Sequence, residues 1–429
     1  MVRIAFNTLG CRLNQSETAV VERTFETPHY RIVDFSEPAD IAVINTCTVT
    51  ENGDADTRRL VNKAVRTNPG VRIALMGCQA QIQKEKLAGL PNVRWIVGNA
   101  RKMDIKSIIE QHANETEAMV IAPAIEKKSF TMPAATVDRD RTRANIKIQD
   151  GCDFFCSFCE IPYARGRARS REFSDIINEC RTLAGAGHQE VVITGINVGT
   201  YGHENKTLMD ILDKLERIDG IKRVRISSIE PTTIDWQMIE RMADGNSKLC
   251  RYLHIPLQSG HNDVLSAMKR KYTLEEFDSF IRKVKSTVPQ VCIGTDVIVG
   301  FPAESEEQFA HTAGYLRDAP VDYFHVFSYS ERHLAKSQFL PESVAPQAKQ
   351  ERSRTLRALS SRKRAAFYKS LENSSVHVLF EEEKDGLWTG LTDNYARIFV
   401  RSEKNLSNTY LPVTVERFED GKLYGNVNP

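Results

Sequence analysis

Short apolar runs alternate with helical patterns along most of the chain, and this alternation is the feature that most restricts its fold. The first 125 residues contain apolar runs at 2–6, 41–44 and 71–76, with helical patterns at 16–25 and 55–65. Runs this short, rich in Val, Ile and Leu, are typical of buried strands. Strands that alternate with helices form parallel sheets. We therefore predict an N-terminal α/β domain over residues 1–125.

A cysteine follows each of these three strands almost at once, at Cys11, Cys47 and Cys78. The carboxyl ends of parallel strands share one edge, where ligands usually bind, so we expect the three thiols to converge there. Buried structural cysteines are the alternative, since free cysteine is among the most buried residue types. The repeated strand-then-cysteine order favours a ligand set. Three thiolates leave one coordination position vacant, which suits a catalytic metal or cluster.

A second group of cysteines lies in the run DGCDFFCSFC, which places Cys152, Cys156 and Cys159 in a C-x3-C-x2-C spacing. One compact loop of this kind can wrap three irons of a cubane cluster and leave the fourth iron open. A zinc knuckle would need a fourth Cys or His nearby, and this neighbourhood has none. The spacing is the strongest single signal in the chain, and it predicts an iron–sulfur site.

The segment 138–370 has the pattern of a partial (β/α)6 barrel. Its expected strands lie at 145–149, 190–194, 223–227, 252–257, 291–299 and 323–329, and its helical patterns include 174–184, 207–218, 274–287 and 305–317. Such barrels carry their chemistry at the carboxyl ends of the strands. The sequences TGINVG, SSIEP, PLQSG and DVIVGFPAE stand at those ends, and the glycines in three of them would let the backbone approach a ligand closely. Each could be an ordinary turn, but four on one rim favour a cofactor pocket.

Charge and composition restrict where the protein works. The N-terminus reads as a strand and not as a signal peptide, so the nine cysteines indicate reduced thiols and a cytoplasmic protein. No stretch approaches the roughly 18 consecutive apolar residues of a membrane span. The net charge is only +2, so any surface for nucleic acid must come from local clustering of charge.

These motifs resemble those of the radical S-adenosylmethionine (SAM) methylthiotransferases, and the resemblance covers nearly the whole chain. It implies two [4Fe-4S] clusters: one that cleaves SAM reductively to a 5′-deoxyadenosyl radical, and an auxiliary cluster that handles the inserted sulfur. The implied ligands are Cys152, Cys156 and Cys159 for the first cluster and Cys11, Cys47 and Cys78 for the second. The implied SAM pocket contains Phe158, beside the adenine, with Gly195, Ser228, Gln258 and Asp296.

Within this family, TLGCRLNQSE, INTCTVTENGDADTRR and GCQAQ look most like the branch that acts on N6-threonylcarbamoyladenosine (t6A) at position 37 of tRNA. That branch inserts sulfur and a methyl group at C2 of the adenine, giving 2-methylthio-t6A. The implied partners are the anticodon loop of tRNA and an electron donor, either a reductase or a flavodoxin or ferredoxin; we expect a monomer. The chain departs from the family at Ala303, where a second glycine is usual.

Two basic segments are candidates for contact with RNA. The arginines at alternate positions after the cysteine loop would point to one side if that stretch were extended: Arg165, Arg167, Arg169 and Arg171. We expect a basic rim formed by these four together with Arg139, Arg141, Arg143 and Lys147. A helical pattern at 346–373 carries eight Lys or Arg against two Glu, and it is either a solvated face or a surface that follows phosphates.

The last segment, 374–429, changes to short strands at 376–382, 387–390, 396–401, 410–415 and 423–427, with Asp-Gly hairpin turns at 385–386 and 420–421. Five such strands predict a small closed β-barrel of the kind that binds RNA. The segment resembles the TRAM domain found at this position in the family. A structural cap for the central barrel is the alternative.

Two other functions remain open at this point. The same chemistry could act on isopentenyladenosine in tRNA or on a ribosomal protein; the ribosomal-protein branch typically carries Pro-Lys where this chain has Arg12 and Leu13. A protein of another class, a non-catalytic iron–sulfur protein that binds RNA, would share the cysteines but not cleave SAM.

Overall fold

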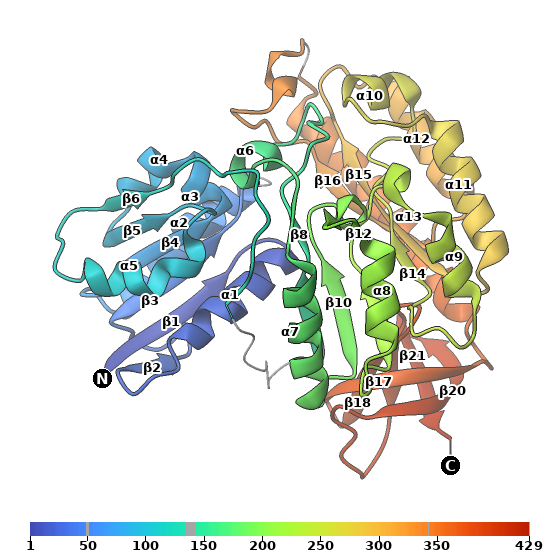
Figure 1. The fold of residues 1–429 in the computed structure, drawn as a ribbon. Helices are drawn as coiled ribbons and strands as arrows, with labels where there is room; N and C mark the ends of the chain where they lie inside the picture. Colours follow the sequence, from blue (N-terminus) through green and yellow to red (C-terminus); the bar gives the residue numbers. More distant parts are fainter. Residues whose placement is uncertain (49–50, 134–141, 342, 429) are drawn as a thin grey trace. The chain divides into compact units, whose positions relative to one another are not determined.

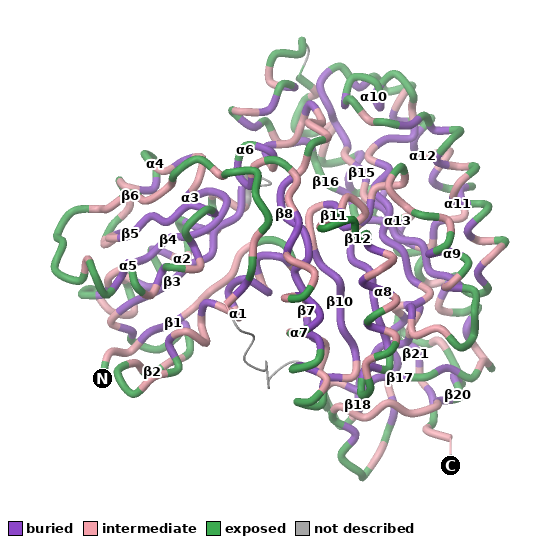
Figure 2. The backbone as a smooth tube through the Cα atoms, in the orientation of Figure 1, coloured by how far each residue is buried: buried purple, intermediate pink, exposed green. Residues whose placement is uncertain are grey.

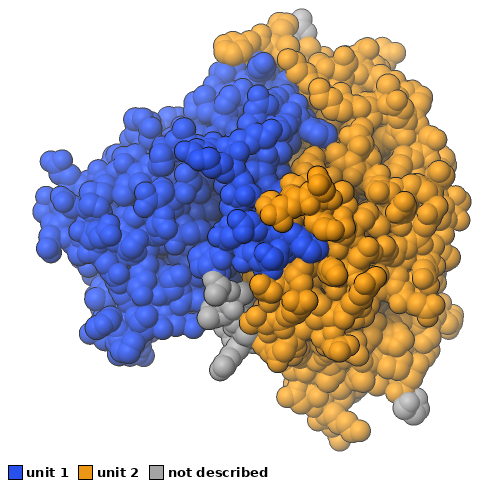
Figure 3. All heavy atoms as spheres, viewed as in Figure 1, with its two compact units in different colours: residues 1–136, 147–176, 330–338 blue, residues 137–146, 177–329, 339–429 orange. Residues whose placement is uncertain are grey.

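The computed structural model describes residues 1–48, 51–133, 142–341 and 343–428. The chain divides into two compact units, each assembled from separate stretches of sequence (Figure 3). Unit 1 comprises 1–136, 147–176 and 330–338, and unit 2 comprises 137–146, 177–329 and 339–429.

Unit 1 is built on a parallel sheet of six strands in the order β2-β1-β3-β4-β5-β6 (Figure 1). The strands are β1 (Val2–Thr8), β2 (Tyr30–Val33), β3 (Ile41–Thr46), β4 (Arg72–Gly77), β5 (Val93–Val97) and β6 (Met119–Ile121). The helices are α1 (Arg12–Thr24), α2 (Glu51–Thr67), α3 (Cys78–Ile82), α4 (Lys84–Ala88) and α5 (Ile105–Gln111). The predicted parallel sheet is confirmed, and it is three strands wider than the sequence pattern indicated.

Both faces of this sheet are buried, because alternate residues of each strand pack against helices on opposite sides. In β3, which is buried along its whole length (Figure 2), Ile41 and Val43 share a core with Val21 of α1. Ala42 and Ile44 of the same strand belong to a second core, which also contains residues of α2 and α4. The sheet therefore forms the middle layer of three. Packing on both faces fixes the positions of its strand ends.

Unit 2 contains a curved sheet whose strands follow the order β7-β10-β13 and then β14-β15-β16. Parallel bridges from Val224 to Leu249 and from Ser228 to His254 join the two halves. The strands are β7 (Arg143–Lys147), β10 (Glu190–Thr194), β13 (Arg223–Ile226), β14 (Tyr252–His254), β15 (Cys292–Val299) and β16 (Tyr323–Ser328). The six strands confirm the predicted partial (β/α)6 barrel.

Helices follow these strands, and several begin at capping boxes. In a capping box, the side chain of the residue before the helix accepts a hydrogen bond from the backbone N–H three residues later, and the side chain of that later residue accepts one from the backbone N–H of the first. Thr273 and Glu276 form one at the start of α11. The helices are α7 (Phe173–Gly185), α8 (Leu208–Glu216), α9 (Trp236–Ala243), α10 (Asn262–Ala267), α11 (Leu274–Thr287), α12 (Glu306–Asp318) and α13 (Pro346–Lys369). Among the described residues, no helix combines the length and apolar character needed to cross a membrane.

The C-terminal segment forms a closed barrel of five strands in the order β17-β18-β19-β21-β20, which confirms the predicted small β-barrel. The strands are β17 (Ser375–Lys384), β18 (Leu387–Thr392), β19 (Arg397–Val400), β20 (Tyr410–Glu419) and β21 (Lys422–Val427). Both predicted hairpin turns have positive φ at Asp and Gly, for example 53° at Asp385 and 76° at Gly386, as type I′ turns require.

Two buried arginines of the curved sheet, Arg223 and Arg225, bind the small barrel by donating hydrogen bonds to its backbone carbonyls. Arg225 in β13 is bound to Glu190 in β10, with Nε 2.7 Å from Oε1, and it also donates to the carbonyl of Thr392 at 3.0 Å. Arg223 pairs with the same carboxylate. Burial alone would raise the pKa of Glu190, but Arg223 and Arg225 outweigh it and lower the pKa to about 2.

We expect Glu190→Ala to lower the free energy of unfolding by about 3–5 kcal/mol at pH 7, because it leaves two arginines buried without their carboxylate. The native pKa of Glu190 lies below its ordinary value of 4.5, so its contribution is present above pH 4.5 and is lost as the pH falls towards 2. Urea unfolding at several pH values measures the difference. Arg282→Ala, which removes an exposed partner of Asp278, is the control and should change little. A difference that did not shrink below pH 4.5 would contradict this role.

Candidate functional site

Three thiols meet at the carboxyl edge of the unit 1 sheet. Cys11 lies three residues after β1, and Cys47 and Cys78 directly follow β3 and β4. Because β1, β3 and β4 are neighbouring parallel strands, their ends bring these residues together, as the sequence predicted. Cys11 is exposed, whereas Cys47 and Cys78 are buried.

Gly10 shows how closely the first two cysteine loops approach one another. Its φ is +91°, and a Cβ at this position would lie 2.7 Å from Cys47 Sγ, so both the conformation and the space require glycine. Asn14, in the first turn of α1, ties the same loops together by donating to the carbonyls of Leu9 at 2.8 Å and Thr46 at 3.1 Å.

The side-chain amide of Asn99 lies beside the third thiol, that of Cys78. Asn99 Nδ2 lies 3.6 Å from Cys78 Sγ and donates to the carbonyl of Ala164 at 2.6 Å. Sequence reasoning missed Asn14 and Asn99. Asn14 stood inside the motif TLGCRLNQSE, and a polar residue on the buried face of a helix is the signal that could have found it.

The second cysteine group lies on a loop closed at its base by a short antiparallel pair, β8 (Gln149–Asp150) and β9 (Arg169–Ser170). Gly151 opens the loop with a φ of +72°, and a Cβ there would collide with the carbonyl of Arg167. The backbone N–H of Cys152 donates to the carbonyl of Gly166 at 3.1 Å. The loop thus carries Cys152, Cys156 and Cys159, each of which is half-buried.

A buried carboxylate follows the last of these cysteines. Glu160 accepts hydrogen bonds from Thr48 at 3.1 Å, from Arg332 at 3.2 Å and from the backbone N–H of Leu334 at 3.0 Å. Since Thr48 adjoins Cys47 and Glu160 adjoins Cys159, this one side chain connects the two thiol groups. The connection crosses 172 residues to Arg332 and has no local signature in the sequence.

A cluster of buried charges lies behind both groups. Its members are Glu17 in α1, Lys102 before α5, Lys147 at the end of β7, Asp150 in β8, and Arg165 at the end of α6 (Ile161–Arg165). Arg165 binds Glu17 and Asp150 at 3.0 and 2.9 Å, and Lys147 binds the same two carboxylates at 2.6 and 2.7 Å.

These contacts shift the pKa values of the groups in the buried charge cluster. Burial would raise the pKa of Glu17, but Arg165, Lys102 and Lys147 outweigh it and lower the pKa. Burial, reinforced by the charge of Arg165, lowers the pKa of Lys102 to about 8. The pKa of Asp150 is lowered in the same way as that of Glu17. Burial would raise it, but the charges of Lys147 and Arg165 outweigh that effect.

The expectation that the alternating arginines form one exposed row is wrong. Arg165 ends a helix and is fully buried, and Arg171 is 1% exposed and bound to Asp175 at 2.6 Å. Arg169 is largely buried against Asp150, and only Arg167 is mostly exposed. The stretch is not extended, since Gly166 turns the chain with a φ of +79°.

The wider basic rim is likewise only partly present. Lys147 is buried in the charge cluster, and Arg143 pairs with Glu381 at 2.6 Å within unit 2. Arg139 and Arg141 lie outside the described residues.

The four residues expected to line a SAM pocket share one rim of unit 2. Three follow strands and one lies within a strand: Gly195 follows β10, Ser228 follows β13, Gln258 follows β14, and Asp296 is in β15. All four are half-buried. Gln258 has a φ of +73°, and its backbone N–H donates to the carbonyl of Asp296 at 2.8 Å. Phe158 belongs to unit 1 and is half-buried on the cysteine loop.

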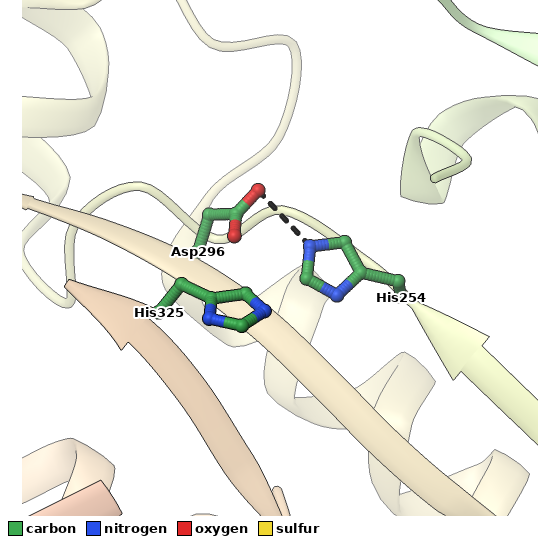
Figure 4. A group of neighbouring side chains, drawn as sticks. All are labelled: His254, Asp296 and His325. Atoms are coloured by element: carbon green, nitrogen blue, oxygen red, sulfur yellow. Dashed lines mark ion pairs between the residues drawn. The ribbon is translucent and has the colours of Figure 1, made fainter. Parts of the chain in front are cut away.

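Asp296 has a histidine partner that sequence reasoning did not find. His254 Nε2 lies 3.0 Å from Asp296 Oδ2, and His325 lies directly across from Asp296 on β16 (Figure 4). The nearest ligand atoms of the three side chains all lie within 4.8 Å of one another. His254 thereby restricts the orientation of the carboxylate.

The thiol groups fit iron–sulfur clusters in their donor chemistry, because each group offers three soft thiolate ligands. In the first group, the buried cation Arg165 acts electrostatically on Cys11 and Cys78. The Arg165 charge opposes the desolvation that raises the pKa of Cys11.

Family models identify the class of protein. Residues 146–316 match the radical SAM superfamily, and residues 3–98 match a family described as uncharacterized protein family UPF0004. The fold is similar to that of the radical S-adenosylmethionine methyltransferase TsrM from Kitasatospora setae, with a TM-score of 0.56 and 14% identity over 76% of this chain and 75% of that one. The barrel and its cysteine loop are therefore those of a radical SAM enzyme.

Relatives with known names define the family more closely. The chain is 37% identical to the threonylcarbamoyladenosine tRNA methylthiotransferase MtaB of Bacillus subtilis, over 97% of this chain and 94% of that protein. It is 32% identical to the tRNA-2-methylthio-N(6)-dimethylallyladenosine synthase of Geobacillus kaustophilus, over 88% and 72%. The chain belongs to the radical SAM methylthiotransferase family. Its cofactors are SAM and two [4Fe-4S] clusters.

We expect Asn14→Ala to lower the free energy of unfolding by about 2–3 kcal/mol, because it leaves the Leu9 and Thr46 carbonyls and one Arg165 N–H without their partner. Gln15→Ala, one residue further along the same helix and half-buried, is the matched control and should stay within about 0.5 kcal/mol. Urea unfolding followed by circular dichroism measures both. Equal effects of the two substitutions would contradict the bridging role of Asn14.

Proposed function

We propose that this protein inserts sulfur and a methyl group at C2 of N6-threonylcarbamoyladenosine 37 in tRNA, giving 2-methylthio-N6-threonylcarbamoyladenosine. The observation that carries the proposal is its similarity along nearly the whole chain to proteins named threonylcarbamoyladenosine tRNA methylthiotransferase. That similarity is 37% identity to the Bacillus subtilis and Aquifex aeolicus proteins, compared with 32% to the Geobacillus kaustophilus synthase that bears the dimethylallyl name.

In this proposal the two thiol groups have different roles. The cluster on Cys152, Cys156 and Cys159 supplies the reductive cleavage of SAM, and that on Cys11, Cys47 and Cys78 supplies the sulfur chemistry. A radical route suits the substrate, because an aromatic C–H offers no acidic proton for ordinary acid–base groups to remove. The proposed domains are 1–125 for the auxiliary cluster, 138–370 for SAM and 374–429 for RNA.

The chain's own residues position these groups. Asn14 and Asn99 hold the auxiliary loops, and Glu160 holds the loop of the radical cluster. We assign SAM binding to Phe158 and to the rim residues Gly195, Ser228, Gln258 and Asp296. His254 would keep the Asp296 carboxylate turned towards the bound SAM, which is a positioning role.

The tRNA contacts are assigned to exposed cations. Arg167 is the member of the predicted arginine row that remains exposed. Helix α13 adds Arg354, Arg357, Arg362, Arg364 and Lys369, all exposed. Contacts of this kind bind phosphates without reading sequence and weaken with salt. The closed barrel of strands β17 to β21 would provide a further surface for the anticodon loop.

The proposed reaction also needs an electron donor. A reductase, flavodoxin or ferredoxin supplies the electrons, and the protein acts as a monomer in the cytoplasm.

Nucleoside mass spectrometry of total tRNA, from cells with and without the gene, tests the substrate. We expect 2-methylthio-t6A to disappear and t6A to accumulate in the deletion strain. Loss of the isopentenyladenosine product instead would move the protein to the other tRNA branch with its chemistry unchanged. No change in either nucleoside would overturn the tRNA assignment and make the ribosomal protein the next substrate to examine.

The division of labour between the clusters predicts two separable defects. Cys152→Ala should stop SAM cleavage altogether, whereas Cys11→Ala should leave cleavage intact and stop sulfur insertion. Both are measured on reduced, anaerobic protein as 5′-deoxyadenosine and as methylthiolated nucleoside. Cys180→Ala, at a buried cysteine outside both groups, is the control. Normal product from either cluster variant would contradict the scheme, and a protein that never cleaves SAM would favour the non-catalytic iron–sulfur alternative.

A further inference from the structure

The buried charge cluster is not neutral by itself. Lys102, Lys147 and Arg165 supply three cations, whereas Glu17 and Asp150 supply two carboxylates, and all five side chains are at most 5% exposed. Arg169, which is largely buried and binds Asp150 at 3.1 Å, adds a fourth cation, so positive charge is in excess. A buried charge without compensation costs several kcal/mol, so the cluster requires an anion nearby.

As metal ligands, the auxiliary cysteines Cys11, Cys47 and Cys78 would be deprotonated thiolates and would supply that negative charge. Arg165 Nη2 donates to Asn14 Oδ1 at 2.5 Å, and the same oxygen lies 3.9 Å from Cys11 Sγ. Lys102 Nζ donates to Asn99 Oδ1 at 2.7 Å, and the amide nitrogen of Asn99 lies 3.6 Å from Cys78 Sγ. Each of these two cations is thus separated from a thiol by a single amide side chain.

One of these amides, Asn99, also orients the field of the charge behind it. Asn99 accepts from the ammonium of Lys102 through its oxygen and turns its N–H towards the sulfur, so its dipole relays positive potential to Cys78. Hydrogen bonds to cluster sulfurs, net charge and solvent exposure are the properties that set the reduction potential of iron–sulfur centres. Burial makes the charge effect large, because the interior screens poorly.

We propose that the charge balance of this buried cluster, through Lys102 and Glu17, sets the reduction potential of the metal centre held by Cys11, Cys47 and Cys78. The inference rests on the proposed function, which assigns that centre to these thiols. Reduction adds one electron, supplied by the electron donor, and no proton, so the centre gains one negative charge. Excess positive charge stabilises that reduced state and raises the potential.

The test uses the full chain carrying Cys152→Ala, Cys156→Ala and Cys159→Ala, so that the auxiliary centre alone contributes to the spectrum. Its midpoint potential is read by redox titration followed by electron paramagnetic resonance. Four variants are compared: Lys102→Met, which removes the cation; Lys102→Arg, which keeps it; Glu17→Gln, which removes an anion; and Arg101→Gln, which removes the exposed neighbouring cation.

Lys102→Met should lower the midpoint potential by about 59 mV or more, a tenfold change in a one-electron equilibrium. Glu17→Gln should raise it by a similar amount. Lys102→Arg and Arg101→Gln should leave it unchanged. Opposite shifts from two buried side chains that do not touch the thiols support an electrostatic role, because loosened packing would not reverse sign with charge.

Two results would overturn the inference. A potential that does not move in Lys102→Met, or that moves equally in Lys102→Arg, shows that the charge of Lys102 does not act on the centre. If Glu17→Gln fails to fold, as judged by circular dichroism, the Lys102 pair decides alone. A parent protein without any iron–sulfur signal fails for a different reason, because it overturns the cluster assignment in the proposed function.

Discussion

Glu17 is a buried carboxylate on which three cations from three segments of the chain converge. Lys102 lies 2.5 Å from it, Lys147 2.6 Å and Arg165 3.0 Å. A carboxylate buried at this depth is tolerated only with such partners, so the segments that carry them are held against α1. The auxiliary thiols and the cysteine loop are thereby positioned by one electrostatic constraint.

Helix α1 shows how the chain accommodates this constraint. Asn14 and Glu17 are three residues apart and therefore share one face of the helix. That face is buried but polar near its N-terminus, where Asn14 reaches the cysteine loops, and it becomes apolar one turn later at Val21. Buried residues are usually apolar. In α1 they are polar where they make hydrogen bonds and ion pairs near the site, at Asn14 and Glu17, and apolar where they only pack, at Val21.

Local pattern was sufficient to predict elements whose determinants are local. The expected ranges 190–194 and 274–287 coincide with β10 and α11, because an apolar run defines the first and a capping box the second. The convergence of Cys11, Cys47 and Cys78 also followed, since strand order in a parallel sheet fixes where the strands end.

The prediction of an arginine row was wrong because the contacts of these arginines are not local in sequence. Spacing in sequence predicted a direction for Arg165, but its partner Glu17 lies 148 residues away, and no local pattern encodes that contact. Ala303 is a smaller example: it occupies the place of an expected glycine and still adopts a φ of +63°, a conformation that its residue type did not predict.

The discontinuity of unit 1 affects the order in which the protein can be completed during synthesis. Residues 330–338 belong to this unit, and Arg332 and Leu334 provide partners for Glu160 beside Cys159. Domains usually fold in order as the chain leaves the ribosome, but the N-terminal unit here lacks part of its interior until residue 338 has emerged. The hydrogen bonds that hold Glu160 beside Cys159 can therefore be completed only after the strands of the central barrel have been translated.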